Sequence, residues 1–265
     1  MEQVHLFLMY AVLGAVSGVL AGLLGVGGGI VLVPVLLFSL ETQGVAATVS
    51  MHMALGTSLA IIVITALASV RAHHRRGAVE WPIVWRITPS ILFGTLLGSG
   101  LADHLSGTVL KKIFGLFALS LAFYLAFGRP PAANRTLPRT AGMAMVGSGV
   151  GFVSALMGIG GGSLSVPFMV WCNVTMRQAV ATSAAIGMPI AIAGATGYVI
   201  TGWGNPLLPS MSLGYVHLSA LLAVALSSVF SAPLGARWAH SIPPLLLRRL
   251  FATLLLMLGG RMLLV

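Results

Sequence analysis

Long apolar stretches, separated by short polar or glycine-rich breaks, fill almost the whole chain. They lie at residues 4–24, 30–40, 45–70, 83–102, 110–127, 141–157, 163–174, 178–200, 214–236 and 249–264. A helix needs about 20 apolar residues to cross the hydrocarbon core of a bilayer, and most of these runs reach or approach that length. The pattern therefore predicts a chain that crosses a membrane many times as helices.

Two of the runs, 30–40 and 163–174, are too short to span a bilayer without tilt. Each follows a cluster with the pattern Gly-x-Gly-Gly-Gly-x₄-Pro, at 25–34 and again 133 residues later at 158–167. Backbone N–H groups freed by such a break are tolerated at membrane depth only where they line a cavity or are buried in protein. The pattern predicts two helix hairpins broken by glycine, and broken helices at corresponding positions of two halves point to a transporter's binding site.

The similarity of the two halves extends beyond the glycine clusters. Residues 54–60 (ALGTSLA) match residues 179–185 (AVATSAA) at an offset of 125, and Leu97-Gly98 matches Leu234-Gly235 at an offset of 137. The second register also places Lys111-Lys112 on Arg248-Arg249 and Phe114 on Phe251. Three blocks that match in the same order indicate an internal duplication.

The Pro- and Arg-rich stretch 128–140 separates the two halves and is typical of a linker. We therefore expect a first membrane repeat at residues 1–127, a cytoplasmic linker at 128–140, and a second membrane repeat at 141–265. Each repeat should hold about five helical segments, which gives 8–10 helices in total.

Composition agrees with a membrane class. The chain is 58% hydrophobic and only 7% charged, with a mean hydropathy of +1.03, whereas soluble domains carry roughly 25% charged residues. The net charge of +10 could suggest nucleic-acid binding, but the basic residues lie in short loops between apolar runs, which is a membrane-orientation pattern. The single cysteine, Cys172, excludes an internal disulfide and a multi-cysteine metal site. The fold class expected is an all-α integral membrane protein without nucleic-acid partners.

The basic residues also select a topology. If each half crosses five times, eleven of the Lys and Arg residues lie on one side and three on the other, whereas four crossings per half divide them eight to six. The positive-inside bias favours five crossings. This predicts an inverted repeat in the cell inner membrane, with the linker in the cytoplasm and both termini outside.

The paired Gly-x-Gly-Gly-Gly-x₄-Pro and Ala-x-x-Thr-Ser blocks resemble those of the sulfite exporter TauE/SafE family of membrane permeases. The resemblance covers nearly the whole chain and implies transport of small anions, such as sulfite, sulfoacetate or other organosulfonates, or carboxylates. Ala181 stands where the first half has Gly56, so the halves need not contact a ligand equally. The matching residues are Gly25, Gly27, Gly28, Gly29, Pro34, Ala54, Gly56, Thr57 and Ser58, and Gly158, Gly160, Gly161, Gly162, Pro167, Ala179, Thr182 and Ser183.

The glycine breaks are the first candidates for substrate binding. A helix N-terminus offers free N–H groups and roughly half a positive charge, and the two short runs begin directly after Gly29 and Gly162. In an inverted repeat both N-termini could converge on one anion, held by Gly27, Gly28 and Gly29 and by Gly160, Gly161, Gly162 and Ser163. The alternative is that these glycines only allow close helix packing.

Hydroxyl groups at equivalent positions are the second set of candidates. Thr57 and Ser58 in the first half correspond to Thr182 and Ser183 in the second, and hydroxyls can donate to an anion without adding a buried charge. Ser and Thr in membrane helices also often bond the carbonyl one turn back, which is the alternative interpretation here.

His52 and Arg177 lie five residues before the two threonines and could attract substrate at a cavity mouth. His52 could titrate near neutrality and couple transport to protons, as could His217; the alternative is a hydrogen-bonded histidine at a helix end. The alternative for Arg177 is an interfacial anchor that fixes the orientation of the chain.

Acidic residues are scarce: Glu2, Glu41, Glu80 and Asp103 are all of them, and none falls inside a predicted span. This disfavours a carboxylate proton relay and a cation site, and it suits a path for anions. We expect no catalytic residue, no metal and no cofactor, a small anionic substrate, contact with the lipid bilayer, and a chain that can pair as a homodimer. A passive anion channel and a membrane-embedded enzyme or assembly factor stay open as alternatives.

Overall fold

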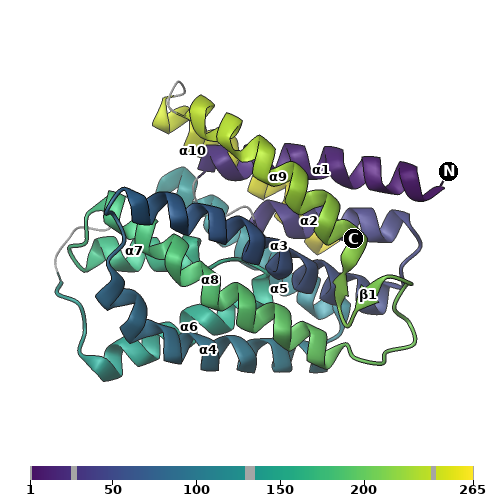
Figure 1. Ribbon diagram of the computed structural model, residues 1–265, viewed down its shortest axis with the longest axis horizontal. Helices are drawn as coiled ribbons and strands as arrows, with labels where there is room; N and C mark the ends of the chain where they lie inside the picture. The colour runs from purple at the N-terminus through teal and green to yellow at the C-terminus, as the bar shows by residue number, and fades with distance from the viewer. Residues whose placement is uncertain (1, 25–28, 129–134, 240–242, 265) are drawn as a thin grey trace.

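The computed structural model describes residues 2–24, 29–128, 135–239 and 243–264, which form ten helices and one short hairpin (Figure 1). The first half contains α1 (Glu2–Leu24), α2 (Gly29–Thr42), α3 (Ala47–Arg75), α4 (Trp81–His104) and α5 (Gly107–Phe127). The second half contains α6 (Thr140–Met157), α7 (Gly162–Trp171), α8 (Met176–Thr201), β1 (Ser212–Leu213), β2 (Val216–His217), α9 (Leu218–Ala239) and α10 (Pro244–Leu264). Every predicted apolar run contains a helix, so the all-α fold class is confirmed.

Two runs begin differently from the helices they predicted: α10 begins at Pro244, five residues before the run 249–264, and the run at 214–236 does not begin as a helix. Its first four residues belong to an antiparallel hairpin in which Ser212 pairs with His217 and Leu213 with Val216, and α9 begins only at Leu218. Gly214 makes the turn at a φ of +54°, and a Cβ at this position would lie 2.2 Å from the carbonyl oxygen of Val199. Tyr215 and Val216 of the hairpin are buried and β2 contacts α3 and α8, whereas Leu213 is exposed. Because Tyr215 and Val216 closely precede α9, the sequence pattern did not separate them from the apolar run of that helix.

Within the described residues, four helices are long and apolar enough to cross a bilayer: α3, α5, α6 and α8. Large apolar side chains also point outward, as expected for a surface in contact with lipid; Phe93, Phe127 and Phe230 are each more than half exposed. By contrast, α2 and α7 have 14 and 10 residues, which at 1.5 Å per residue is shorter than the roughly 30 Å hydrocarbon core. These two helices are too short to cross it alone.

The two halves pack into each other. Helix α1 lies along α9, and α6 lies along α4 (Figure 1). A methyl group built on Gly14 of α1 would lie 2.1 Å from Ser227 Oγ, and one built on Gly147 of α6 would lie 2.1 Å from Ser90 Oγ. Gly147 follows Gly14 by 133 residues and Ser227 follows Ser90 by 137, which are the offsets already found in the sequence. The repeated contact supports the predicted duplication.

Glycine at these crossings permits backbones to approach closely, which leads to a testable expectation for α4. Gly94→Val should lower the free energy of unfolding by about 1–3 kcal/mol, because a Cβ there would lie only 2.1 Å from the carbonyl oxygen of Ser148 in α6. Gly100→Val is the matched control in the same helix, since no atom lies within 4 Å of its Cβ position. Thermal unfolding in detergent measures the difference; equal melting temperatures for the two variants would show that the crossing tolerates a side chain.

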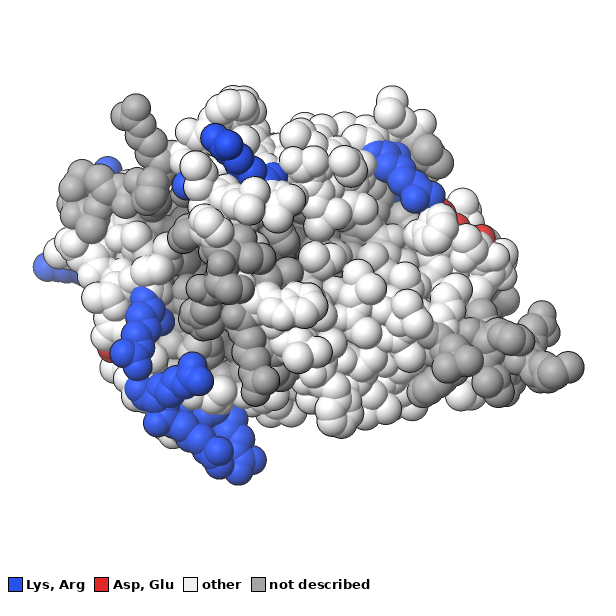
Figure 2. All heavy atoms as spheres, turned by 90° about the horizontal axis from the view of Figure 1, so that it is seen from above, with Lys and Arg blue, Asp and Glu red and all other residues white. Residues whose placement is uncertain are grey.

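Polar contacts connect neighbouring segments at each of the two ends of the helix bundle. At one end Gln178 bonds Glu80, and the backbone N–H of Arg135 donates to the carbonyl of Trp171 at 3.2 Å. At the other end Lys111 pairs with Glu41. Most Lys and Arg side chains visible in Figure 2 lie toward its left side, the side on which α7 lies in Figure 1. This distribution supports the predicted division of positive charge between two faces.

Candidate functional site

The first residue of α2 meets the second glycine break inside the protein. The first residue of α2, Gly29, lies against the end of α6: a methyl group built on it would be 2.6 Å from the carbonyl oxygen of Gly158 and 2.9 Å from Cα of Ile159. Ser58 of α3 contacts the same residue, because its Oγ donates a buried hydrogen bond to the Gly158 carbonyl at 2.8 Å. Segments from both halves therefore share one buried contact.

Glycine is required by the backbone of the second break. Gly158 ends α6 at a φ of +62°, and Gly161 precedes α7 at a φ of +76°, where L side chains are disfavoured. No side chain caps the N-terminus of α7 at Gly161, so the first N–H groups of this helix keep their capacity to bind an anion. Ser165 Oγ donates to the Gly161 carbonyl at 2.9 Å, which fixes the turn.

The remaining glycines that were predicted to bind substrate have different surroundings. Gly160 packs against α8, since a methyl group built on Gly187 would lie 2.8 Å from its carbonyl oxygen. Gly162 is buried at the start of α7, and the half-buried Ser163 follows it. Gly27 and Gly28 lie outside the described residues.

One hydroxyl near the second break has no partner. Ser154 Oγ lies 3.4 Å from the position of a Cβ on Gly161, and the Ser154 side chain is fully buried. No hydrogen bond to this oxygen is made by any residue in the described part of the chain. An unpaired buried hydroxyl costs about 1–3 kcal/mol, so its presence beside a helix N-terminus suits a ligand. Sequence reasoning missed Ser154; a serine in the last turn before a glycine cluster was the available signal.

Thr57 and Thr182 make equivalent bonds across the two halves. Thr57 Oγ1 accepts from the backbone N–H of His217 at 2.9 Å, directly before α9. Thr182 Oγ1 accepts from the backbone N–H of Glu80 at 3.0 Å, directly before α4. The threonines differ by 125 residues and their partners by 137. Each hydroxyl thus joins one half to the other, a role that the sequence interpretation had not included.

This pairing predicts an unequal cost of removing the two hydroxyls. Thr57→Val should lower the free energy of unfolding by about 1–3 kcal/mol, because it leaves the N–H of a buried residue unpaired. Thr182→Val should cost less, because Glu80 is half-buried and water can reach its N–H. Chemical unfolding in detergent compares the two, with Thr57→Ser as the control that restores the acceptor. A loss in Thr57→Ser as large as in Thr57→Val would contradict this explanation.

His52 occupies a helix junction. Its Nε2 lies 2.9 Å from the Ala102 carbonyl and 3.1 Å from the Leu105 carbonyl, at the end of α4, and its ring stacks on Tyr215 at 5.0 Å between centroids. These contacts match the interpretation of a hydrogen-bonded histidine at a helix end. The ring is buried, and its Nδ1 has no partner in the described part of the chain.

The other predicted polar residues lie apart from the breaks or within the packing. Arg177 is exposed in the first turn of α8, as an interfacial anchor would be. Ser183 is buried within α8. His217 accepts at Nδ1 from the N–H of Ala220 at 3.2 Å, and burial lowers the pKa of its imidazole below the ordinary value. This bond and this shift both favour neutral His217.

A cavity of about 210 Å³ opens beside the second break. Gly162 and Ser163 form part of its wall, together with Ile30 of α2 and Arg248 of α10. The cavity connects the N-terminal turns of both short helices with a basic side chain. Arg248 was interpreted from the sequence only as a residue that fixes topology.

Two interrupted helix pairs that meet inside a lipid-facing α-helical protein, with equivalent contacts from two halves, are features of membrane transporters. The class of protein is thus a multi-pass membrane transporter. A family model described as "Sulfite exporter TauE/SafE" matches residues 10–262. The chain belongs to this family, which confirms the resemblance found in the sequence.

The names of relatives with similar sequences also describe membrane transporters. A "Probable membrane transporter protein" from Haemophilus influenzae is 35% identical over 257 residues, 96% of this chain and 97% of the relative. Another from Methanocaldococcus jannaschii is 28% identical over 99% of this chain and 97% of its own length. A third from Bacillus subtilis, YunE, is 31% identical over 75% of this chain and 80% of its own length. No solved structure matches the chain.

Proposed function

We propose that this transporter moves small anions, in the first place sulfite or organosulfonates such as sulfoacetate, and holds them at the two glycine breaks. The contact of Gly29 with Gly158 and Ile159 is the observation that carries the proposal. It brings the N-terminus of α2 to the second break, from which α7 also starts. Two helix N-termini near one place supply converging N–H donors and positive partial charge.

The polar side chains around the breaks suit an anion. Ser154 and Ser163 contribute hydroxyls near the start of α7, and Ser154 has no other partner within the described residues. The acids whose side chains are described, Glu41, Glu80 and Asp103, lie at helix ends. The breaks therefore offer donors without a nearby carboxylate that would repel an anion.

Exchange between two states is the proposed transport mechanism. The contacts of α1 with α9 and of α6 with α4 are related by the offsets of 133 and 137 found between the two halves, and with the distribution of basic residues they support an inverted repeat. Inverted repeats supply two related conformations, each open to one side. A passive anion channel with the same lining residues is the second candidate, because a continuous path would use the same donors.

Transport into proteoliposomes tests the proposal. Liposomes are loaded in turn with sulfite, sulfoacetate, taurine or sulfate, and we expect saturable flux of a sulfur anion. The rate of this flux is measured with and without a pH gradient. Counterflow, in which unlabelled anion on one side drives labelled anion in, separates a carrier from a channel. Absence of flux for all four, with folded protein shown in the liposomes, would refute the proposed substrate class.

A further inference from the structure

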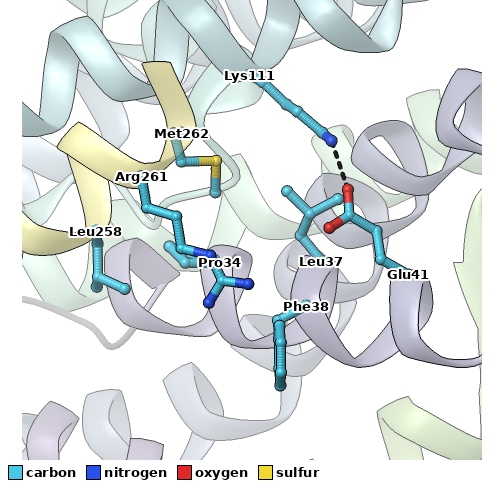
Figure 3. A pocket seen from close by; sticks show the side chains of 8 residues that line it. All are labelled: Pro34, Leu37, Phe38, Glu41, Lys111, Leu258, Arg261 and Met262. Carbon is cyan, nitrogen blue, oxygen red and sulfur yellow. Dashed lines mark hydrogen bonds and ion pairs between the residues drawn. The ribbon is translucent and has the colours of Figure 1, made fainter. Parts of the chain in front are cut away.

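Two cavities lie beside the antiparallel pair α5 and α10, one near each end of it. The first is lined by Pro34 of α2, Lys111 of α5 and Arg261 of α10, and it has a volume of about 50 Å³ (Figure 3). The second is lined by Pro167 of α7 and Arg248 of α10, and it has a volume of about 210 Å³. Each cavity thus joins the proline of a short helix to the α5–α10 pair.

The two cavities are built from equivalent residues. Pro167 follows Pro34 by 133 residues, and Arg248 follows Lys111 by 137. Three residues of α5 in the second cavity also correspond to three residues of α10 in the first cavity, again at an offset of 137. The pairs are Leu121 and Leu258, Tyr124 and Arg261, and Leu125 and Met262. The same site therefore occurs twice, once in each half.

Of the equivalent residues Lys111 and Arg248, only Lys111 is paired with an acid among the described residues; the first cavity also contains Arg261, whose guanidinium lies 4.7 Å from the centroid of the Phe38 ring. Lys111 pairs with Glu41, which lies in the last turn of α2, and Figure 3 shows the two side chains meeting at the cavity. Helix α7 ends at Trp171 and has 10 residues against the 14 of α2, so it lacks the turn that would carry an equivalent acid. The residue 133 positions after Glu41 is Val174.

Arg248 therefore keeps most of its binding capacity. Among the described residues, its guanidinium donates one bond, at 2.8 Å to the carbonyl of Gly128, whereas a guanidinium has five N–H donors. No ion pair links it to a carboxylate in the described part of the chain. The half-buried arginine at the edge of a cavity is thus available to an anionic ligand.

The rest of the lining selects the kind of anion. Apart from Arg248 and Ser163, the walls are mostly apolar, with Ile30, Val166 and Phe251 among them. Apolar walls do not solvate charge, so one guanidinium suits one negative charge. A doubly charged inorganic ion would leave a charge without a partner. An anion with a carbon chain can place its charge at Arg248 and its chain against the walls.

We propose that this cavity binds a small organic monoanion with an apolar carbon body, and that Arg248 contacts its anionic group. The inference rests on the proposed function and deepens it, because it names organic sulfonates or carboxylates over inorganic sulfur oxyanions as the preferred class. The equivalent cavity, in which Glu41 binds Lys111 and Arg261 lies over Phe38, is the smaller counterpart of this site.

Binding of 1-propanesulfonate and of sulfate to the purified protein, measured by calorimetry in a neutral detergent, tests the inference. Propanesulfonate should bind more tightly than sulfate, and Arg248→Gln should weaken its binding roughly tenfold to hundredfold. Arg249→Gln is the matched control, because the next side chain is exposed and does not line the cavity; it should bind as the unaltered protein does. Val166→Phe, which fills the cavity without changing charge, should also abolish binding.

Three results would overturn the inference: equal binding by Arg248→Gln, sulfate binding as tight as that of propanesulfonate, or unchanged binding by Val166→Phe. A further arm adds phosphatidylglycerol to the micelles. Arg248-dependent binding of this lipid that displaces propanesulfonate would assign the cavity to a lipid headgroup instead. Failure of the proposed function is distinguishable, since it would abolish anion flux in proteoliposomes while Arg248-dependent binding of propanesulfonate persisted.

Discussion

Gly29→Ala is expected to lower the transport rate roughly tenfold or more, while the protein still inserts into the membrane. The added methyl group would lie 2.6 Å from the Gly158 carbonyl oxygen and 2.9 Å from Cα of Ile159. Both are backbone atoms, so no side-chain rotation can relieve the clash, and the two breaks must move apart. If N–H groups from both breaks hold the anion, this displacement removes their convergence.

Gly149→Ala is the control for this variant. It adds the same methyl group to α6, but no atom lies within 4 Å of the new Cβ, and the position is exposed. Initial rates of anion uptake at equal protein content measure the difference between the two variants. Transport by Gly29→Ala at the rate of Gly149→Ala would show that the contact between the breaks has no part in substrate binding.

Ser154→Ala is expected to change stability and transport in opposite directions. Removing an unpaired buried hydroxyl should raise the free energy of unfolding by about 1 kcal/mol, because Ser154 Oγ has no partner among the described residues. The same change removes a hydroxyl near Gly161, and the loss of one donor to an anion should weaken transport roughly tenfold. A site that costs stability and serves function behaves in this way.

The pair of measurements separates the two roles of Ser154. Ser120→Ala provides the control, since its hydroxyl bonds the carbonyl of Leu116 on an exposed face of α5, and both stability and transport should stay near those of the unaltered protein. Thermal unfolding and uptake are measured on the same preparations. A stabilised Ser154→Ala that transports at the full rate would show that the hydroxyl does not contact the anion.

The helices could be predicted from the sequence because each coincides over most of its length with an apolar run, and the breaks because glycine clusters interrupt these runs. The hairpin at 212–217 could not, since its Tyr215 and Val216 closely precede the apolar sequence of α9 and were counted with it. Its burial comes from contact with distant helices, among them the bond from His217 to Thr57, 160 residues away. The hydrophobicity of a run indicates that its residues are buried, but it does not show which other segments they contact.

The glycines, Ser58 and Ser163 of the candidate site were singled out from the sequence, whereas Ser154 and Arg248 were not. Arg248 appeared to be one basic residue among several that fix orientation, because its contact with Gly128 and its place beside α7 depend on how α10 packs. The register that aligns Lys111 with Arg248 held the missing signal. This register becomes informative only when the lengths of α2 and α7 are also known. The sequence pattern does not define these lengths to the accuracy of one helical turn.

The extra turn of α2 has a consequence for the proposed exchange between two transport states. Glu41 and Lys111, with side chains 32% and 13% exposed, form their ion pair at one end only, and the shorter α7 has no equivalent at the other. If the two transport states exchange the roles of the two ends, this pair stabilises one state alone. An energy difference on the order of 1 kcal/mol corresponds to a ratio of roughly five to one between the states. The duplicated carrier would then have a preferred resting orientation before any gradient acts on it.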